Sequence, residues 1–167
     1  MYDYIRYDSP LGTLTIAAEN DALTTLVIEE QKYAEFHLAG VGRELETPML
    51  QEAKTWLDRY FAGQRPDLTE LPLAPKGTVF QRCVWQELLK IPYGRTESYG
   101  SLAARLGSSA RAVGSAVGRN PISVIIPCHR VVGKDGGLCG YAGGQENKEK
   151  LLRLEEIRVD EERSERI

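Results

Sequence analysis

The stretch QRPDLTELPLAPKG, at residues 64–77, constrains the fold of this chain more than any other segment. It carries three prolines and has no helical periodicity. Because proline fixes φ and lacks a backbone N–H donor, neither a long helix nor a central strand can run through such a segment. The chain of 167 residues is therefore predicted to fold in two parts joined by a linker.

The part before the linker is predicted to be a small antiparallel meander covered by a helix. Three strand-like runs are separated by the turns SPLG and END: YDYIRY, LGTLTIAA and ALTTLVIE. The segment TPMLQEAKTWLDRYFAG is typical of a helix with Thr47 as its cap and Pro48 at its first position. Its apolar stripe, which we expect to face the strands, consists of Leu50, Ala53, Leu57 and Phe61.

The part after the linker is predicted to be mainly helical. A helix is expected over TVFQRCVWQELLK, ending before Pro92, and one side of it carries Phe80, Val84 and Leu88. Two short helices follow, SYGSLAARLG and RAVGSAVGRNP, and the turn SSA joins them. This succession of helix, short turn and helix is typical of a helix-turn-helix.

The second of these short helices has small residues where a core helix would carry leucines: Ala112, Gly114, Ala116 and Gly118. A helical glycine costs about 1 kcal/mol relative to alanine, so the pattern requires a reason. Two explanations stay open at this point. Either a DNA groove approaches the helix closely, or another helix packs tightly against it.

The remaining segments complete the predicted organisation. The run SVIIP, at 123–127, is expected to be a short strand that leads to Cys128, and GKDGGLCGYAGG is expected to be a glycine-rich loop that shapes a pocket. The last helix, NKEKLLRLEE, is expected to begin with Asn147 as its cap. We thus expect a domain with its linker over 1–75, a second domain over 76–158, and a frayed charged tail over 159–167.

The composition argues against several classes of protein. The first residues have no signal-peptide pattern, and no apolar run approaches the roughly 20 residues of a membrane span. Three cysteines without CxxC spacing indicate a reducing compartment, so we expect a cytoplasmic protein without a membrane partner. Because only two histidines occur, His37 and His129, a structural zinc site is not expected.

Charge is distributed unevenly along the chain, whose net charge is −3. Residues 76–153 hold 12 Lys and Arg against 5 Asp and Glu, whereas the rest of the chain holds 9 against 19. A basic segment within an acidic chain indicates a face for an anion such as a phosphate backbone. A solvated charge asymmetry without any partner is the alternative.

The segment IIPCHRVV, at 125–132, places a thiol beside an imidazole. A cysteine reacts as its thiolate and has an ordinary pKa of about 8.5, so Cys128 needs a proton acceptor or nearby positive charge. Adjacent side chains of an extended segment point to opposite faces, so a link from Cys128 to His129 requires a turn at Pro127 or a bridging water. Glu155 could orient the imidazole as the third member of a relay. The plainer alternative is a buried, inert thiol.

Four segments carry a family resemblance, in this order: FQRCVWQELLKIPYGRTESYG, RAVGSAVGRNP, IPCHRVV and GYAGGQENKEKLL. Together they resemble the O6-alkylguanine-DNA alkyltransferase family, strongly over 78–155 and loosely over the first half, through YDSPLG. The resemblance implies an α/β (α+β) protein with a ribonuclease H-like N-terminal domain. Its C-terminal domain would be mainly helical and winged-helix-like, with the helix-turn-helix.

The resemblance also implies the reaction. An alkyl group passes irreversibly from O6 of guanine in double-stranded DNA to the protein's own cysteine, with O4 of thymine as a further candidate substrate. Cys128 would be the acceptor, His129 the water-linked base and Glu155 its carboxylate partner. Asn120 would belong to the hinge between the recognition helix and the active-site segment.

Further residues are implied for DNA recognition through the minor groove. Arg111 would fill the gap that the flipped nucleotide leaves, and Tyr99 would rotate the 3′ phosphate. Small residues of the recognition helix, Ala112 and Gly114, would contact DNA. Tyr141 and Ala142 would line the guanine pocket. No cofactor or obligate protein partner is implied. No metal is expected, because the first half lacks the Cys/His cluster that binds zinc in some relatives. Cys139, in the pocket loop, departs from the family pattern.

Three other functions stay open. A module that flags lesions without removing them would have the acceptor cysteine replaced, whereas Cys128 is present. A helix-turn-helix transcription factor would need base-reading polar side chains on the helix that here carries alanine and glycine. A Cys-His hydrolase would turn over an acyl substrate repeatedly.

Overall fold

The computed structural model describes residues 2–138 and 140–157, and these form two compact units. The N-terminal unit contains the described residues up to Lys76 together with Pro121–Ile125. The C-terminal unit contains Gly77–Asn120 and the described residues from Ile126 onward. The tail at 159–167 and Cys139 lie outside the described residues. Within the described part, no helix is long and apolar enough to cross a membrane.

The N-terminal unit is built on a four-stranded sheet with the order β3-β2-β1-β4. Its strands are β1 (Tyr2–Ser9), β2 (Gly12–Glu19), β3 (Ala22–Ile28) and β4 (Val41–Glu44). The first three pair antiparallel, with Ile5 opposite Ile16 and Leu14 opposite Ile28, which confirms the predicted meander. Alternation of side chains along β2 turns Leu14 and Ile16 into the core, where both are fully buried.

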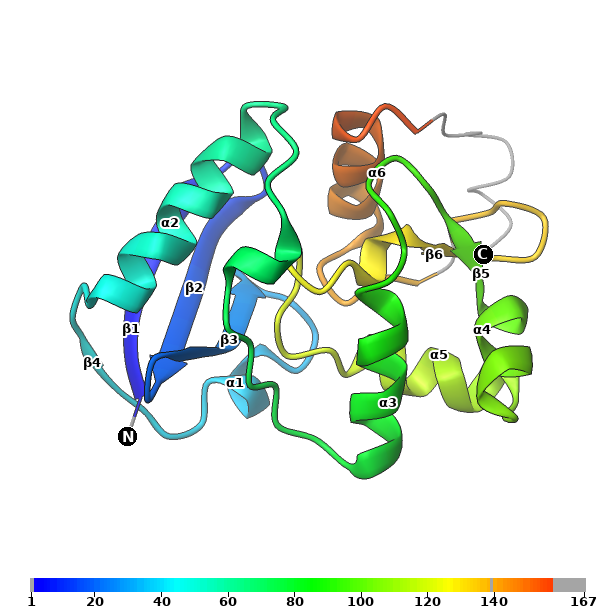
Figure 1. Ribbon diagram of the computed structural model, residues 1–167, viewed down its shortest axis with the longest axis horizontal. Helices are drawn as coiled ribbons and strands as arrows, with labels where there is room; N and C mark the ends of the chain where they lie inside the picture. The colour runs from blue at the N-terminus through cyan, green and yellow to red at the C-terminus, as the bar shows by residue number, and fades with distance from the viewer. Residues whose placement is uncertain (1, 139, 158–167) are drawn as a thin grey trace. The chain divides into compact units, whose positions relative to one another are not determined.

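Helix α2 (Pro48–Phe61) packs along one face of this sheet (Figure 1). The Thr47 hydroxyl accepts a hydrogen bond from the backbone N–H of Leu50, and Pro48 occupies the first turn, as predicted. The prediction for Phe61 is wrong in part, because this ring is only half-buried and stacks on Tyr7. Trp56 and Tyr60 are buried instead, because the sheet covers a wider stripe of the helix than the expected positions.

Several elements of the N-terminal unit escaped prediction because long-range pairing creates them. Strand β4 pairs parallel with β1, and the short α1 (Ala34–His37) precedes it. The proline-rich linker is also ordered: it forms the 3-10 turn η1 (Leu68–Glu70) and pairs with Leu23 on β3. The backbone of Leu23 donates to Pro72 O and accepts from Ala74 N, so this edge pairing needs no donor from a proline.

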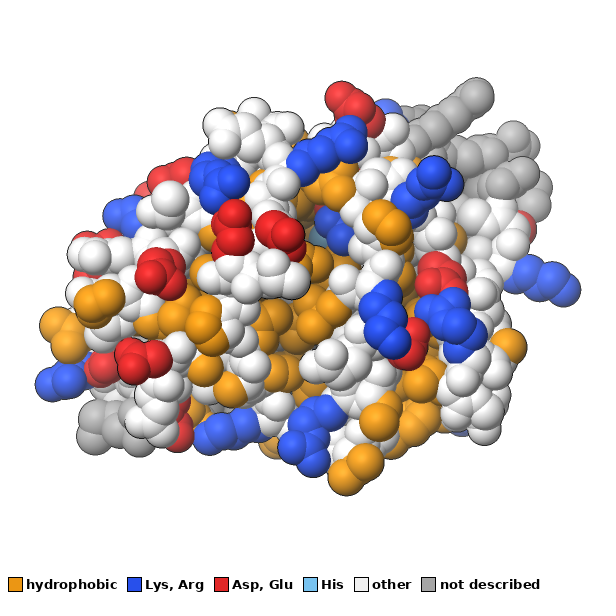
Figure 2. Space-filling view, viewed as in Figure 1, with side chains coloured by type: hydrophobic (Ala, Val, Ile, Leu, Met, Phe, Trp, Pro, Cys, Tyr) orange, Lys and Arg blue, Asp and Glu red, His pale blue; other side chains and the backbone are white. Residues whose placement is uncertain are grey.

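The C-terminal unit is mainly helical, as predicted. Its elements are α3 (Val79–Leu88), β5 (Glu97–Ser98), α4 (Tyr99–Leu106), α5 (Ala110–Gly118), the 3-10 turn η2 (Cys128–Arg130), β6 (Val131–Val132) and α6 (Gln145–Leu154). Thr78 and Gln81 form a capping box that starts α3. Val84 and Leu88 are buried, whereas Phe80, on the same side of α3 but in its first turn, is 37% exposed. Exposed apolar side chains lie at the beginning of α3 (Figure 2).

Two predictions about the second half are corrected by the structure. The run 123–127 is not a strand: Val124 has a φ of 71°, which breaks an extended conformation, and the segment folds into consecutive turns. Helix α6 begins at Gln145 with Gly144 as its N-cap, three residues before the expected cap. Asn147 therefore lies inside the helix, and its side-chain amide donates to Gly143 O.

Candidate active site and DNA-facing helices

The helices α4 and α5 form the predicted helix-turn-helix in the C-terminal unit. The Ser98 side chain caps the N-terminus of α4, and Gly107 ends this helix with a φ of 63°. Two residues later, the Ser109 side chain caps the N-terminus of α5. A left-handed residue at this position ends a helix without a steric cost only when it is glycine. Trp85 of α3 holds α5 in place, since its buried indole N–H donates to Ala116 O at 2.9 Å.

One face of α5 is open. Arg111 is exposed, and Ala112, Gly114 and Gly118 are half-exposed. A Cβ atom added at Gly118 would meet nothing within 4 Å, and one added at Gly114 would meet only the Tyr99 ring, at an ordinary 3.7 Å. Tight helix packing therefore does not explain these two glycines. The other explanation, close approach of a partner outside the unit, is consistent with the open face.

The thiol segment is a turn rather than a strand. Cys128 begins η2, its backbone N–H donates to Ile126 O at 2.7 Å, and its side chain is 3% exposed. Burial raises the pKa of the Cys128 thiol. Hydrogen bonding by the Asn120 and Tyr141 side chains and the positive charge of Lys148 act in the opposite direction. Three polar groups from separate segments of the chain, Asn120, Tyr141 and Lys148, thus act on one sulfur.

Asn120 fixes the position of this turn. It is 1% exposed, and its side-chain amide donates to Ile126 O at 2.9 Å. The same residue follows Arg119, the C-cap of α5, and its backbone N–H donates to Val117 O. The end of α5 is thereby tied to the start of the thiol segment.

His129 and Glu155 form a buried pair next to the thiol. His129 Nε2 lies 2.6 Å from Glu155 Oε2, and both side chains are inaccessible to solvent. Burial alone would raise the pKa of Glu155, but hydrogen bonds from His129 and Arg130, together with the positive charge of Arg130, lower it to about 2. The ionised carboxylate can only accept, so Nε2 of the ring carries the proton. No described residue hydrogen-bonds Nδ1, which is left as the acceptor of the imidazole.

Burial also lowers the pKa of His129, and the charges of Arg130 and Lys148 add to this effect, while Glu155 opposes it. The imidazole is consequently neutral at physiological pH. A neutral imidazole with a free Nδ1 lone pair can take a proton from a thiol, either directly or through a water molecule.

Two cations of this site were not among the predicted residues. Arg130 Nε donates to Glu155 Oε1 at 2.7 Å. Lys148 is fully buried, and its ammonium donates to Val131 O at 2.6 Å and to Leu138 O. The spacing of Lys148, Leu151, Leu152 and Glu155 on one helical face could have indicated that both charged residues point inward.

The structure brings together only part of the predicted set. Cys128, Asn120 and Tyr141 meet at the thiol, and His129 meets Glu155. Ala142 is half-buried in the turn that follows Tyr141. Four residues lie on the helix-turn-helix instead: Tyr99, Arg111, Ala112 and Gly114. Within the described residues, no group of three or more His, Cys, Asp or Glu side chains could hold a metal ion.

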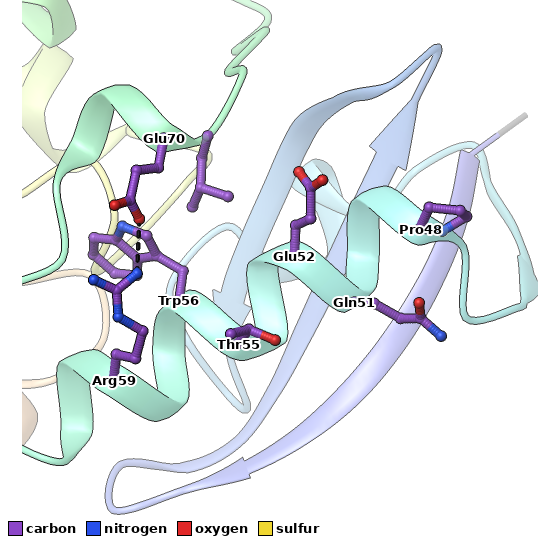
Figure 3. Close-up of a pocket in the computed structure, with 8 residues that line it drawn as sticks. Pro48, Gln51, Glu52, Thr55, Trp56, Arg59 and Glu70 are labelled. Carbon is purple, nitrogen blue, oxygen red and sulfur yellow. Dashed lines mark hydrogen bonds and ion pairs between the residues drawn. The ribbon is translucent and has the colours of Figure 1, made fainter.

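A groove of about 480 Å³ lies along α2 in the N-terminal unit (Figure 3). Trp56 forms part of its wall, and the ion pair of Arg59 with Glu70, at 2.9 Å, crosses it. It contains neither a thiol nor a histidine. This groove therefore cannot supply the chemistry that the thiol segment offers.

Both halves of the chain match models of known protein families. Residues 2–75 match the family model described as 6-O-methylguanine DNA methyltransferase, ribonuclease-like domain. Residues 79–157 match the model described as 6-O-methylguanine DNA methyltransferase, DNA binding domain. The family resemblance drawn from the four motifs is thereby confirmed, together with the predicted fold class, and it extends over the first half, where the motifs matched only loosely.

Individual relatives are similar over nearly their whole length. The chain is 43% identical over 159 residues to the methylated-DNA--protein-cysteine methyltransferase of Haemophilus influenzae, covering 92% of this chain and 86% of that protein. It is 45% identical to the constitutive protein of the same name from Bacillus subtilis, covering 95% and 98%. The crystal structure of Mycobacterium tuberculosis OGT in complex with DNA has a TM-score of 0.84, with 43% identity and coverage of 92% and 93%.

Proposed function

Because the chain belongs to the 6-O-methylguanine DNA methyltransferase family, we propose that it repairs double-stranded DNA by direct reversal, moving an alkyl group from O6 of guanine to its own Cys128. The observation that carries this proposal is the buried thiol at the start of η2, followed directly by an imidazole whose Nε2 is held by Glu155. O4-alkylthymine is a further candidate substrate of the same site.

The proposed reaction is a displacement at the alkyl carbon. The Cys128 thiol loses its proton to Nδ1 of His129, through a water molecule, as the sulfur attacks. The new S–C bond forms while the C–O6 bond breaks, and the electron pair of that bond stays with guanine. The departing guanine then takes a proton from the Tyr99 hydroxyl, which regains one from the His129 imidazolium through solvent, or it is stabilised by a hydrogen bond from a backbone N–H. Glu155 stabilises the imidazolium that forms.

The reaction should occur once for each protein molecule. The product is a thioether, whose thiolate is a poor leaving group, so neighbouring side chains do not remove the alkyl group from Cys128. No cofactor is needed, because the substrate supplies the alkyl group and the chain supplies the base. The protein therefore acts as a stoichiometric acceptor, with activity limited by its own amount.

The helix-turn-helix is proposed to bind the DNA, within an alkyl-acceptor domain that spans about residues 76–158. Small residues on the open face of α5, Ala112 and Gly114, allow the duplex backbone to approach closely. Flipping a base costs a few kcal/mol, and an inserted Arg111 side chain would offset part of that cost in the minor groove. Tyr99, which contacts the Gly114 position, would act on the adjoining phosphate.

The remaining predicted residues are proposed to shape the pocket. Tyr141 and Ala142 would line the space that receives the flipped guanine. Asn120 would keep the thiol turn in register with the recognition helix through its bond to Ile126 O. We further propose that the protein acts in the cytoplasm, where reducing conditions keep Cys128 as a thiol.

The decisive experiment is the intact mass of the protein after incubation with duplex DNA that contains O6-methylguanine. We expect a gain of one methyl group, mapped by peptide analysis to Cys128, and no gain with Cys128→Ser. Cys83→Ser is the matched control, because Cys83 is an exposed thiol on α3 and should not affect transfer. A methyl group on Cys139 would contradict the choice of acceptor. Unchanged mass with retained DNA binding would favour the lesion-flagging function.

A further inference from the structure

The buried guanidinium of Arg130 has no role in the reaction described so far. Arg130 is 4% exposed, although a buried cation is costly unless it is paired. Its Nε donates to Glu155 Oε1 at 2.7 Å, and its Nη1 donates to Ile91 O at 2.6 Å. The guanidinium carbon also lies 5.8 Å from the centre of the Tyr93 ring. These contacts hold the group rigidly at one place.

The two oxygens of Glu155 are divided between different partners. Oε1 accepts from Arg130 and, at 3.3 Å, from the backbone N–H of Gly94, whereas Oε2 faces His129. Because Oε1 is already satisfied, the carboxylate cannot rotate without losing these bonds. The orientation of the oxygen that receives the imidazole N–H is therefore set by groups that never touch the substrate.

We propose that Arg130 is a positioning residue of the alkyl transfer, which orients Glu155 so that Nε2 of His129 carries the proton and Nδ1 stays free as the base. This inference rests on the proposed function and deepens it, since it adds a residue to the relay. Arg130 acts through Glu155, and its positive charge also offsets the negative charge that would otherwise favour the imidazolium.

Three charged side chains act on His129. The ionisable groups that act on its imidazole are Glu155 and Lys148, from the end and the inner face of α6, and Arg130, which follows it in the chain. Cys128 precedes it in the same turn. Helix α3 also packs against η2, and it carries its ionisable residues at exposed or half-exposed positions: Arg82, Cys83 and Glu87.

Removal of the Arg130 charge should make His129 more basic. With Arg130→Met, Glu155 keeps its charge but loses its compensating cation, so the imidazolium is favoured and the pKa of His129 rises. The pH below which alkyl transfer fails should then move upward by roughly one unit, as expected for loss of one nearby charge. Transfer should recover at higher pH, because the neutral base is restored there.

The test combines two readouts on the full-length protein. The first is the titration of His129 followed by ¹⁵N NMR in the absence of DNA, which also reports which ring nitrogen carries the proton. The second is the pH profile of single-turnover methyl transfer from O6-methylguanine DNA. We expect a raised His129 pKa and a matching shift of the acid limb in Arg130→Met, and a smaller shift in Arg130→Lys, which keeps the charge but not both hydrogen bonds.

Tyr93→Phe is the matched control at the same corner of the fold. It removes the hydrogen bond from the Tyr93 hydroxyl to Leu154 O but keeps the ring beside Arg130 and every charge. It should lower stability without moving the His129 titration. If Arg130→Met slows transfer equally at all pH values and leaves the His129 titration unchanged, Arg130 is only structural and the proposal is wrong.

The design separates this proposal from the proposed function. If the wild-type protein transfers no methyl group, the proposed function fails, whereas the NMR titration still decides whether Arg130 sets the state of His129. If Arg130→Met does not fold, Arg130→Lys carries the same test. An unshifted titration and unchanged tautomer in Arg130→Lys, with slowed transfer at every pH, would overturn the positioning role.

Discussion

Glu155 Oε2 lies 2.6 Å from His129 Nε2, although the two residues are 26 positions apart in the chain. The contact joins the C-cap of α6 to the turn that carries Cys128, and both side chains are fully buried. The adjacent Glu156 is exposed, so Glu155 is the glutamate of this pair that contacts His129. This pair converts an ordinary imidazole into one with a defined tautomer, and most of the expected behaviour of the site depends on it.

Replacement of Glu155 should slow alkyl transfer. Glu155→Gln keeps the size of the side chain but removes the charge that stabilises the imidazolium, so we expect a rate reduction on the order of 10²-fold. Single-turnover transfer of a radiolabelled methyl group from duplex DNA measures it. Glu156→Gln, at the exposed neighbouring position, should leave the rate unchanged. Equal rates for both variants would contradict the role of Glu155.

Acid should destabilise the protein through the same carboxylate. The folded pKa of Glu155 is about 2, below its ordinary value of 4.5, so its contribution is fully present above pH 4.5 and is lost as the pH falls towards 2. That difference corresponds to about 3 kcal/mol of unfolding free energy. Urea unfolding between pH 2 and pH 6 should show a steeper loss for the wild type than for Glu155→Gln. Parallel curves for the two proteins would be the contrary result.

Replacement of Gly114, in the middle of α5, by alanine should raise the stability of the protein and lower its affinity for DNA. A Cβ at Gly114 would meet the Tyr99 ring at 3.7 Å, an ordinary contact, so Gly114→Ala should raise the unfolding free energy by about 0.5–1 kcal/mol. The same methyl group should weaken DNA binding if the duplex backbone approaches this face. Gly100→Ala, at an exposed position of α4, should stabilise similarly with a smaller effect on affinity. Unaltered affinity in Gly114→Ala would mean that DNA binds elsewhere.

Arg111 should matter only when a base has to be flipped. Arg111→Ala is expected to slow transfer from O6-methylguanine in a duplex, because the stacking energy of a few kcal/mol is no longer offset. Transfer from the free base O6-benzylguanine, which needs no flipping, should proceed at the wild-type rate. Arg153→Ala removes one exposed positive charge from α6 and controls for charge alone. Equal slowing with both substrates would exclude the insertion role.

Much of the fold follows from local sequence. Thr47, Ser98 and Gly107 act at the helix ends where capping chemistry predicts them, because a hydroxyl acceptor or a left-handed glycine depends only on neighbouring residues. The meander follows from alternation along the strands. The errors at Phe61 and Asn147 are shifts within correctly predicted helices, since the exact stripe and start depend on the partner surface.

The sequence by itself placed Cys128 beside His129 in IIPCHRVV and identified the family, because adjacent residues and the order of motifs can be read without knowledge of the fold. Only the tertiary structure decided that Glu155 reaches His129, that Arg130 holds Glu155, and that Lys148 and Asn120 act on the Cys128 turn. Val124 is an example of why the sequence was insufficient. β-branched residues favour an extended backbone, but Val124 has a φ of 71°, because contacts with the surrounding structure set its conformation. Buried charges are stable only as a network, and a network exists only once its distant members have been brought together.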